Sequence, residues 1–498
     1  MNACPAGVDV PAYITLTAQG RYAEALEVHR TRNPFALVCG RVCPAFCESR
    51  CRRGDIDEPI AIRAIKRFMA DQELKNPWTP QTAPGTGEKV AIIGAGPAGL
   101  TAALRLRQMG HAVTVFEALP VAGGMLAVGI PDYRLPRDIL DAEINNILRA
   151  GVDLKLNTAL GRDFTLEDLL QRDGYKAVIV ATGAHISRKL GIPGEEAMGA
   201  YHGIDFLKDV ALGRAPDLNG KKIAVVGGGN VAIDAARTAL RLGAEQVNII
   251  YRRTRNDMPA YAEEIEAAEK EGCIIHYLTN PIEAIVKNGR ITAIRCQNQT
   301  LGGFDRSGRR RPVPQEGSEF NIECDLLIPA IGQQTDVSWL NSNHLQTKRD
   351  GTFVTNKAFA TTVPGVFAAG DNNSGPASVV EAVAQGNKVA VAVDAYLRTG
   401  ELVNPVYEPA YVFPEMAWNL EDYASAHRPE MPELEPKQRS RNWDEVELGL
   451  SEEVAQEECQ RCLRCDLEWL RTMGGRTKPL AEMYRIPMLT VEEPAAGS

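Results

Sequence analysis

The stretch KVAIIGAGPAGLTAALRLRQMGHAVTVFE, residues 89–117, decides the fold of this chain. It runs from an apolar strand through a glycine-rich turn into a helix and then into a second apolar strand. Gly94 permits the tight turn, Gly96 lets the backbone approach a pyrophosphate, and Gly99 lets the helix pack closely on the strand. Glu117 ends the second strand, where a carboxylate can bond both ribose hydroxyls. This unit predicts a Rossmann-like domain that binds a dinucleotide.

A second unit of the same kind follows in KIAVVGGGNVAIDAARTALRLGAEQVNIIYRR, residues 222–253. It has the GxGxxA form of the motif, at Gly227, Gly229 and Ala232. Its second strand ends not in an acid but in Arg252 and Arg253. A carboxylate here would repel a 2′-phosphate, whereas guanidinium groups bind one bidentately. The pattern favours NADP(H) over NAD(H), although two solvated arginines at a strand end would leave the same pattern.

Length and charge exclude several classes of function. A chain of 498 residues exceeds what one hydrophobic core usually supports, so two or three domains are expected. The net charge of −9 gives no basic face for nucleic acid. We find no apolar run long enough for a membrane span and no apolar core of a signal peptide, so the expected location is the cytoplasm.

The texture of the sequence divides the chain into a helical head, a body and a tail. Residues 1–76 show the three- and four-residue apolar spacing of helices, and residues 77–88 are rich in Pro, Gly and Thr, as linkers are. From residue 89 short apolar runs alternate with helical patterns, which predicts an α/β fold with parallel sheets. We expect a Pro-rich strap at 404–437 and a tail at 438–498, with a short helical pattern that runs from Trp443 to Leu470.

Eight of the eleven cysteines lie at the two ends of the chain. They are Cys4, Cys39, Cys43, Cys47 and Cys51 in the head, and Cys459, Cys462 and Cys465 in the tail. Clustered cysteines in a large cytosolic chain bind metal more often than they form disulfides. The close CxxCxxC spacing favours a [4Fe–4S] cluster, with zinc as the alternative. The isolated Cys273, Cys296 and Cys324 are expected to pack as small apolar side chains.

The body resembles the glutathione-reductase-like superfamily. The resemblance is carried by the two glycine-rich units, by AVIVATGA (177–184) and LLIPAIGQQ (326–334), and by PGVFAAGD (364–371). It implies an FAD domain in two parts, 89–205 and 335–403, with an NAD(P)H domain at 206–334 inserted between them. Neither domain holds two neighbouring cysteines, so we do not expect disulfide reductase chemistry.

Further motifs make the resemblance more specific. CGRVCPAFCESRC (39–51), GGMLAVGIPDYRLP (123–136) and YRRTRNDMPA (251–260) are similar to the small subunit of NADPH-dependent glutamate synthase. The same pattern occurs in the large subunit of ferredoxin:NADP transhydrogenase and in the N-terminal half of dihydropyrimidine dehydrogenase. The resemblance implies FAD, NADP(H) and two [4Fe–4S] clusters. It implies hydride transfer from NADPH to flavin N5, then single electrons through the clusters to a partner subunit.

The cluster motif that normally opens the head of this family stands here in the tail, so the chain looks circularly shifted. The resemblance implies one cluster on Cys51, Cys459, Cys462 and Cys465, with Cys459 inferred from the cysteine count alone. It implies a second cluster on Cys4, Cys43 and Cys47 with a Glu or Gln of the following helix. That position falls near Lys66, whose ammonium cannot ligate iron, and Cys39 is the obvious substitute.

The expected nucleotide contacts fall into two groups. For FAD they are Gly94, Gly96, Pro97, Ala98, Gly99, Glu117, Ala118, Gly124, Met125, Thr182, Gly183, Gly370, Asp371 and Val379. For NADPH they are Gly227, Gly229, Asn230, Val231, Ala232, Arg252 and Arg253. We expect no catalytic acid or base. Two other hypotheses stay open: a flavin that splits its electrons between two acceptors, and a subunit that only holds clusters.

Overall fold

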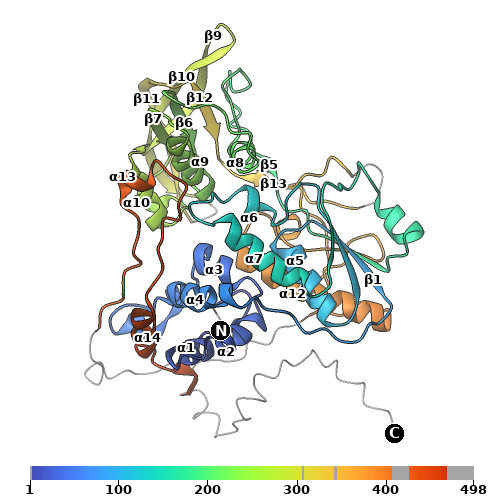
Figure 1. The fold of residues 1–498 in the computed structure, drawn as a ribbon. Helices are drawn as coiled ribbons and strands as arrows, with labels where there is room; N and C mark the ends of the chain where they lie inside the picture. Colours follow the sequence, from blue (N-terminus) through green and yellow to red (C-terminus); the bar gives the residue numbers. More distant parts are fainter. Residues whose placement is uncertain (1–2, 306–307, 341–344, 406–425, 468–498) are drawn as a thin grey trace.

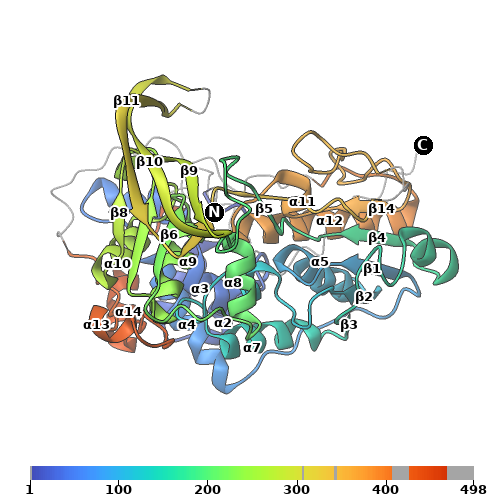
Figure 2. The ribbon, with the colours of Figure 1, turned by 90° about the horizontal axis from the view of Figure 1, so that it is seen from above.

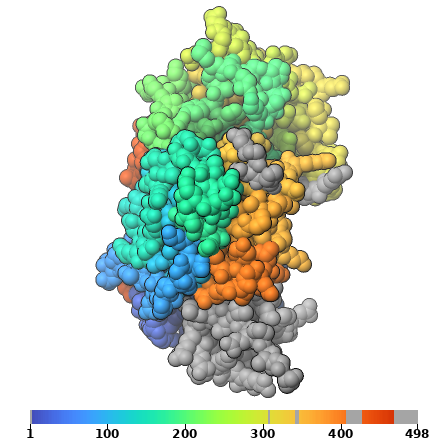
Figure 3. Space-filling model, turned by 90° about the vertical axis from the view of Figure 1, so that its right-hand side faces the viewer, coloured from blue at the N-terminus to red at the C-terminus, as the bar shows by residue number. Residues whose placement is uncertain are grey.

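A helical head lies beneath two α/β units in the computed structural model (Figure 1). The structure describes residues 3–305, 308–340, 345–405 and 426–467. In the space-filling view of Figure 3, the green and yellow segments around β6–β11 form one end of the molecule, and the orange segment around α12 lies below them. The helices of the head are α1 (Val10–Ala18), α2 (Tyr22–Arg30), α3 (Ala36–Val42) and α4 (Ile62–Asp71).

The head packs on the first α/β unit through α3. The first amides of a helix have no partner within the helix. Here Leu37 N–H and Val38 N–H donate to the Glu143 carboxylate at 2.9 and 2.8 Å, from helix α7 of the neighbouring unit. The buried apolar residues of the head and of this unit form one continuous core. The head is therefore fixed to the body by both apolar packing and a cross-domain cap.

The first α/β unit is a five-stranded sheet in the order β14-β4-β1-β2-β3, with every pairing parallel. Strand β4, and strand β1 after the exposed Lys89, are apolar because helices cover both faces of the sheet. Strand β14 joins the sheet only after the chain has built the second unit, as an inserted domain requires. The elements are β1 (Lys89–Ile93), α5 (Pro97–Gln108), β2 (Ala112–Phe116), α6 (Met125–Val128), α7 (Arg137–Leu148), β3 (Asp153–Lys155), β4 (Ala177–Val180), β14 (Val366–Ala368), α11 (Asp371–Ser374) and α12 (Val379–Thr399).

The second α/β unit is a four-stranded parallel sheet in the order β12-β6-β7-β8. Its own apolar core includes Cys273, and the adjoining core beneath the antiparallel strands includes Cys296 and Cys324, as expected for these isolated cysteines. The elements are α8 (Gly203–Ala211), β6 (Lys222–Val226), α9 (Asn230–Arg241), β7 (Gln246–Ile250), α10 (Ala262–Glu271), β8 (Ile274–His276) and β12 (Leu326–Pro329).

An antiparallel sheet in the order β11-β10-β9 adjoins this unit, and the sequence had led us to expect only parallel sheets. Its bounds are β9 (Thr279–Lys287), β10 (Arg290–Phe304) and β11 (Arg310–Glu323). Figure 2 shows the β10–β11 hairpin projecting from the unit. A short antiparallel pair, β5 (Ile186–Ser187) with β13 (Gln333–Gln334), lies where the chain crosses between the two units.

The C-terminal part returns to the head, as predicted. We call residues 426–451 the return segment; it contains α13 (Pro436–Arg439) and leads into α14 (Glu452–Gln460). The expected helical pattern began at Trp443, but the helix begins only after Ser451, whose hydroxyl caps Val454 N–H at 3.3 Å. Tyr22 Oη donates to Glu452 at 2.5 Å and Ala61 N–H to Glu458 at 2.7 Å, so α14 is bound to the head.

Part of the expected strap, residues 406–425, and residues 468–498 of the expected tail lie outside the described residues. Within the described ranges no helix has both the length and the apolar character that a membrane crossing needs.

Candidate dinucleotide and iron–sulfur sites

One pocket of about 1440 Å³ is lined by the glycine-rich turns of both α/β units. Nearly every predicted nucleotide contact borders it: Gly94, Gly96, Pro97, Ala98, Glu117, Ala118, Gly124, Met125, Thr182, Gly183, Gly370, Asp371, Val379, Gly227, Gly229, Asn230, Val231, Arg252 and Arg253. The other two predicted contacts, Gly99 and Ala232, are buried and do not border the pocket. A Cβ at Gly99 would lie 2.0 Å from Gly94 O, which explains why the helix needs glycine there.

The first glycine of each motif occupies the same environment in both units. Gly94 has a φ of +107°, and a Cβ on it would lie 2.3 Å from Ala181 O. Gly227 has a φ of +145°, and a Cβ on it would lie 2.3 Å from Ala330 O. The left-handed conformation and the contact with a neighbouring strand each exclude a side chain.

The second glycine of each motif faces open space instead. A Cβ at Gly96 would meet nothing closer than Gly124 Cα at 3.9 Å, and one at Gly229 nothing closer than Pro259 Cγ at 3.9 Å. Helices α5 and α9 begin directly after these glycines, so their unpaired N-terminal amides adjoin the same space. Both turns thus offer a backbone surface and a helix N-terminus to a pyrophosphate.

Polar groups in the first unit fit a flavin nucleotide. The Glu117 carboxylate accepts hydrogen bonds from Ala95 N–H and Leu119 N–H, both at 2.8 Å, and burial raises its pKa. Burial also raises the pKa of Asp371 to about 6. Thr182 Oγ1 is buried without a hydrogen-bond partner among the described residues, although Thr182 borders the pocket. A buried hydroxyl without a partner indicates a ligand that supplies one.

The two arginines expected at the NADPH end differ in environment. Arg252 is exposed, whereas the Arg253 side chain is only 5% exposed and forms an ion pair with Asp305 at 2.8 Å. Sequence reasoning treated the two as equivalent phosphate ligands. The pairing with Asp305 could not be predicted from the sequence, because Asp305 lies on the β10–β11 turn, some fifty positions after Arg253.

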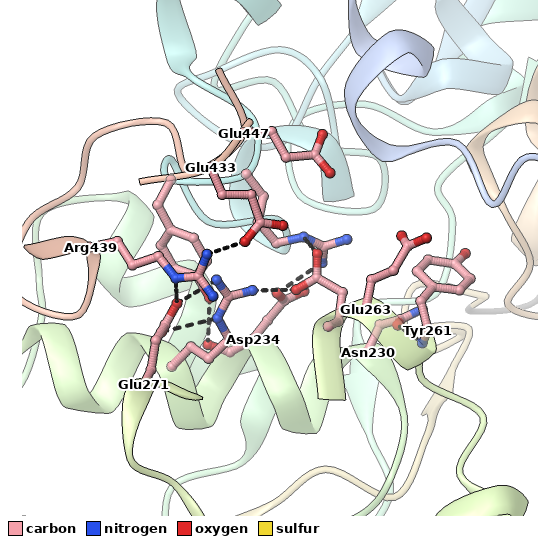
Figure 4. A network of polar contacts seen from close by, with 12 residues as sticks. Asn230, Asp234, Tyr261, Glu263, Glu271, Glu433, Arg439 and Glu447 are labelled. Atoms are coloured by element: carbon pink, nitrogen blue, oxygen red, sulfur yellow. Dashed lines mark hydrogen bonds and ion pairs between the residues drawn. The ribbon is translucent and has the colours of Figure 1, made fainter. Parts of the chain in front are cut away.

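A polar network missed by sequence reasoning joins the two units beside the pocket (Figure 4). Arg134, from the loop after α6, forms ion pairs with Asp234 of α9 at 2.7 Å and with Glu264 of α10 at 2.9 Å. Asn230 Oδ1 accepts a hydrogen bond from Tyr261 N–H at 3.2 Å. Arg134, Asp234 and Asn230 border the pocket, so the network fixes one nucleotide motif relative to the other.

Four cysteines of the head form a first group, which we call the head quartet: Cys4, Cys39, Cys43 and Cys47. Asn33 Nδ2 donates to Cys39 Sγ at 3.3 Å. A hydrogen bond with Cys39, aided by the charge of Lys66, lowers the pKa of Cys43 to about 5. Burial raises the pKa of Cys47 to about 12, so binding to a cation is what would deprotonate this thiol.

Lys66 of α4 lies among the head quartet and is 5% exposed. Burial by itself lowers the pKa of a lysine. The charges of all four quartet cysteines outweigh burial here, and the pKa of Lys66 is raised. The resemblance puts a Glu or Gln ligand near this position, and the structure has a buried ammonium there with Cys39 close by.

The remaining four cysteines form the tail quartet: Cys51, Cys459, Cys462 and Cys465. Burial, with Cys465 and Cys51 nearby, raises the pKa of Cys462 to about 11. Burial, with Cys462 nearby, raises the pKa of Cys459 to about 12. Arg53 Nη1 donates to Arg461 O at 3.3 Å and Arg461 Nη2 to Asp57 at 2.9 Å, which holds this part of the tail beside Cys51.

Within the described residues no three His, Cys, Asp or Glu side chains converge on a point that a single metal ion could occupy. A cubane is a larger body than one ion, so its thiolates stand farther apart than the ligands of a mononuclear site. The donor sets fit iron–sulfur chemistry because each quartet offers four cysteine thiols, the ligand set of a [4Fe–4S] cluster.

The head quartet adjoins the nucleotide pocket. Val42 and Pro44, on either side of Cys43, and Phe46, which precedes Cys47, border the pocket. The first α/β unit therefore presents its nucleotide site to the head quartet, whereas none of the four cysteines of the tail quartet borders the pocket.

Two protein-family models match the chain. The pyridine nucleotide-disulphide oxidoreductase model matches residues 88–386. The model described as dihydropyrimidine dehydrogenase domain II, 4Fe-4S cluster, matches residues 1–78. Together they cover the head and both α/β units and confirm the predicted fold class.

Three curated relatives are named as subunits or chains of oxidoreductases. The NADP(+)-dependent formate dehydrogenase subunit beta of Moorella thermoacetica is 48% identical, over 95% of this chain and 71% of that protein. The NADPH-Fe(3+) oxidoreductase subunit beta of Geobacter sulfurreducens is 40% identical, over 93% and 74%. The glutamate synthase [NADPH] small chain of Escherichia coli is 34% identical, over 79% and 87%, which confirms the predicted resemblance.

Among solved structures, FprA of Mycobacterium tuberculosis in complex with NADPH shares the fold, with a TM-score of 0.54. It is 21% identical, and the alignment covers 64% of this chain and 86% of that one. At this identity the likeness supports the two-unit nucleotide-binding architecture and nothing finer.

Proposed function

The chain belongs to the pyridine nucleotide-disulphide oxidoreductase family, and from this premise we propose that it oxidises NADPH and relays single electrons to a partner subunit. The relay would run through two [4Fe–4S] clusters. The observation that carries the proposal is the single pocket bordered by both glycine-rich turns and by Val42, Pro44 and Phe46 of the head. Two nucleotides and a cluster site thus adjoin one space.

FAD would be held by the first α/β unit. Gly96 and the N-terminus of α5 would receive its pyrophosphate, and Glu117 its ribose hydroxyls. The unpaired Thr182 hydroxyl would gain a polar partner. Bound FAD supplies the exchange between a two-electron hydride donor and one-electron carriers. The chain itself contributes positioning, so no side chain has to act as acid or base.

NADPH would be held by the second unit, with its pyrophosphate at Gly229 and the N-terminus of α9. The Arg134–Asp234 ion pair then serves to keep the α9 motif in register with the FAD unit. Because a misplacement of about 1 Å between the reacting groups can slow a reaction about 100-fold, a buried ion pair between the two units suits this chemistry.

The clusters would be held by the two quartets. The head quartet adjoins the pocket and would take electrons first, and the tail quartet would pass them outward. Lys66 stands where the resemblance implies a carboxylate or amide ligand, so Cys39 completes the head quartet in this proposal. The match of residues 1–78 to a 4Fe-4S domain supports a cluster in the head. The second cluster rests on the grouping of the other four cysteines.

The partner would be a subunit that carries the second substrate. The three relatives are each named as one subunit or chain of a larger oxidoreductase. The two that match 93% and 95% of this chain must share part of its tail. We therefore propose a partner that contacts the molecule near the tail quartet, where the electron path would reach the surface.

Anaerobic mixing with pyridine nucleotides tests the proposal. The purified, cofactor-loaded chain is mixed with NADPH or NADH while flavin absorbance near 450 nm is followed. We expect rapid bleaching by NADPH and much slower bleaching by NADH; no bleaching by either would refute the enzyme assignment. Iron analysis of the same sample should give about eight Fe per chain, and about four would remove one cluster.

A further inference from the structure

Two residues of the β10–β11 turn, Asp305 and Arg309, lie near the proposed NADPH end of the pocket. They bond to each other, with Asp305 N–H donating to Arg309 O at 2.7 Å and Arg309 N–H to Asp305 Oδ1 at 3.2 Å. Arg309 is exposed and borders the pocket together with Arg252 and Arg253. Arg309 lies outside the glycine-rich dinucleotide motif.

Arg253 holds that turn against the end of β7. Its Nη2 donates to Asp305 Oδ2 at 2.8 Å and its Nε to Arg310 O at 2.9 Å. Both contacts are with the hairpin, and the guanidinium is nearly buried. Arg253 already uses two N–H groups of its guanidinium to bind the hairpin. It is therefore poorly placed to form a bidentate pair with a ligand, because such a pair needs two parallel N–H groups.

The contacts of Arg253 with the hairpin keep Arg309 close to the end of β7. Tyr251 directly follows β7, and its hydroxyl donates to Asp257 O at 2.6 Å. Burial raises the pKa of Tyr251, while the charges of Arg253 and Arg309 lower it, so both guanidinium groups lie near the phenol. Arg309 thus stands beside the strand end where the ribose of a dinucleotide binds in this fold.

We propose that Arg309 is a specificity-determining residue for the 2′-phosphate of NADPH, acting together with Arg252. Arg253 is a positioning residue, which acts through Asp305 by holding the turn in place. This inference rests on the proposed NADPH site and names the group that would discriminate within it. NADH has a neutral hydroxyl in place of the 2′-phosphate, so Arg309 stabilises only the phosphorylated nucleotide.

Calorimetric binding of nucleotide fragments tests the role of Arg309 without measuring activity. Adenosine 2′,5′-bisphosphate carries the 2′-phosphate, and AMP lacks it. With the cofactor-loaded full chain, Arg309→Gln should weaken binding of the bisphosphate by about 10- to 100-fold, the value of a charge-assisted hydrogen bond. AMP affinity should change by less than about twofold. Arg311→Gln is the matched control, because Arg311 is exposed on the same hairpin but does not border the pocket.

A second variant tests the positioning role of Arg253. Asp305→Asn removes the carboxylate charge that Arg253 binds but leaves Arg309 in the chain. We expect it to weaken bisphosphate binding by several-fold, with flavin content and thermal midpoint as the checks on folding. If the folded Asp305→Asn protein binds the bisphosphate as tightly as wild type, Arg253 does not act through the turn.

The outcomes separate this inference from the proposed function. A wild-type chain that binds the bisphosphate no better than AMP would refute NADPH as the donor, and with it both proposals. A wild-type preference that survives Arg309→Gln but is lost in Arg252→Gln would overturn the inference alone. Loss of the preference in Arg309→Gln and its retention in Arg311→Gln would support both.

Discussion

The return segment is held to the second α/β unit by Arg439, and substitution of this residue tests how the ends of the chain are joined. Arg439 is 1% exposed and forms ion pairs with Glu271 at 3.1 Å and with Glu433 (Figure 4). Glu271 also binds Arg237 at 2.6 Å and Arg241 at 2.7 Å. One fully buried carboxylate thus receives three guanidinium groups, one of them from the return segment.

The network contains equal numbers of positive and negative side chains, and this balance determines how much stability a substitution of Arg439 should cost. Its four arginines, Arg134, Arg237, Arg241 and Arg439, face four carboxylates, Asp234, Glu264, Glu271 and Glu433. Breaking a buried pair costs about 3–5 kcal/mol when the remaining charge has no partner. In Arg439→Gln, however, Glu271 keeps two guanidinium groups, and Glu433 is 42% exposed and can be hydrated. We therefore expect a loss near that of one charged hydrogen bond, about 2 kcal/mol.

Hydrogen exchange of the return segment measures this loss locally. Val446 N–H donates to Tyr133 O at 2.9 Å and Leu448 N–H to Pro432 O at 2.7 Å. A loss of about 2 kcal/mol in local opening corresponds to about 30-fold faster exchange of such amides. Peptides covering 430–450 should show this increase in Arg439→Gln. Arg441→Gln is the matched control, because Arg441 is exposed on the same segment.

Glu271→Gln completes the test, because it removes the one carboxylate that Arg241 contacts among the described residues, whereas Arg237 keeps Glu264 and Arg439 keeps Glu433. It should destabilise the second unit by about 3–5 kcal/mol, more than Arg439→Gln. Unchanged exchange in Arg439→Gln, or an effect equal to that of Glu271→Gln, would refute this account of the network.

Three further predictions concern the flavin site, the clusters and pH. Gly94→Ala should abolish FAD retention, since its Cβ would lie 2.3 Å from Ala181 O; a normal ratio of flavin to protein absorbance would contradict this. Cys462→Ser should lower iron by about four per chain and spare flavin bleaching by NADPH, whereas complete loss of iron would mean that the quartets are not independent. Burial raises the pKa of Glu143 to about 7, so the folded chain binds a proton that the unfolded chain releases above its ordinary pKa of 4.5. Stability in urea should therefore fall as pH rises from about 4.5 to 7, and Glu143→Gln should flatten that fall; an equal slope in both proteins would exclude Glu143 as its source.

The glycines of both nucleotide motifs could be placed from the sequence because their requirements are local. Gly94 and Gly227 need a positive φ and space for a neighbouring strand, and both needs follow from the spacing of the motif itself. The return of the tail to the head was also predictable. The cysteine pattern of the tail lacked a fourth ligand, and Cys51 could supply it.

Contacts between segments far apart in the chain could not be predicted in this way. The Arg253–Asp305 pair depends on how the β10–β11 hairpin bends, and no periodic pattern records that bend. The Arg134–Asp234 pair depends on the angle between two domains. The helix of the tail was predicted too long, because the helical pattern from Trp443 includes residues before Ser451 that form no helix in the structure, and Val446 N–H there donates to Tyr133 O. Tertiary contacts there override local propensity.

The long stretch of chain between Cys51 and the other three cysteines of the tail quartet costs little stability. The cost of closing a loop rises by only about 0.6 kcal/mol for each doubling of the loop's length. A connection between Cys51 and the tail cysteines that is eight times longer than a short one therefore adds only about 2 kcal/mol. The return segment recovers this through ion pairs with the head, Arg41–Glu445 at 2.8 Å and Arg63–Glu447 at 2.7 Å. The same segment binds the second α/β unit through Arg439. The ligands that we propose for the cluster of the tail quartet therefore depend on contacts with both the head and the second α/β unit, and loosening either contact should lower occupancy of the tail quartet before that of the head quartet.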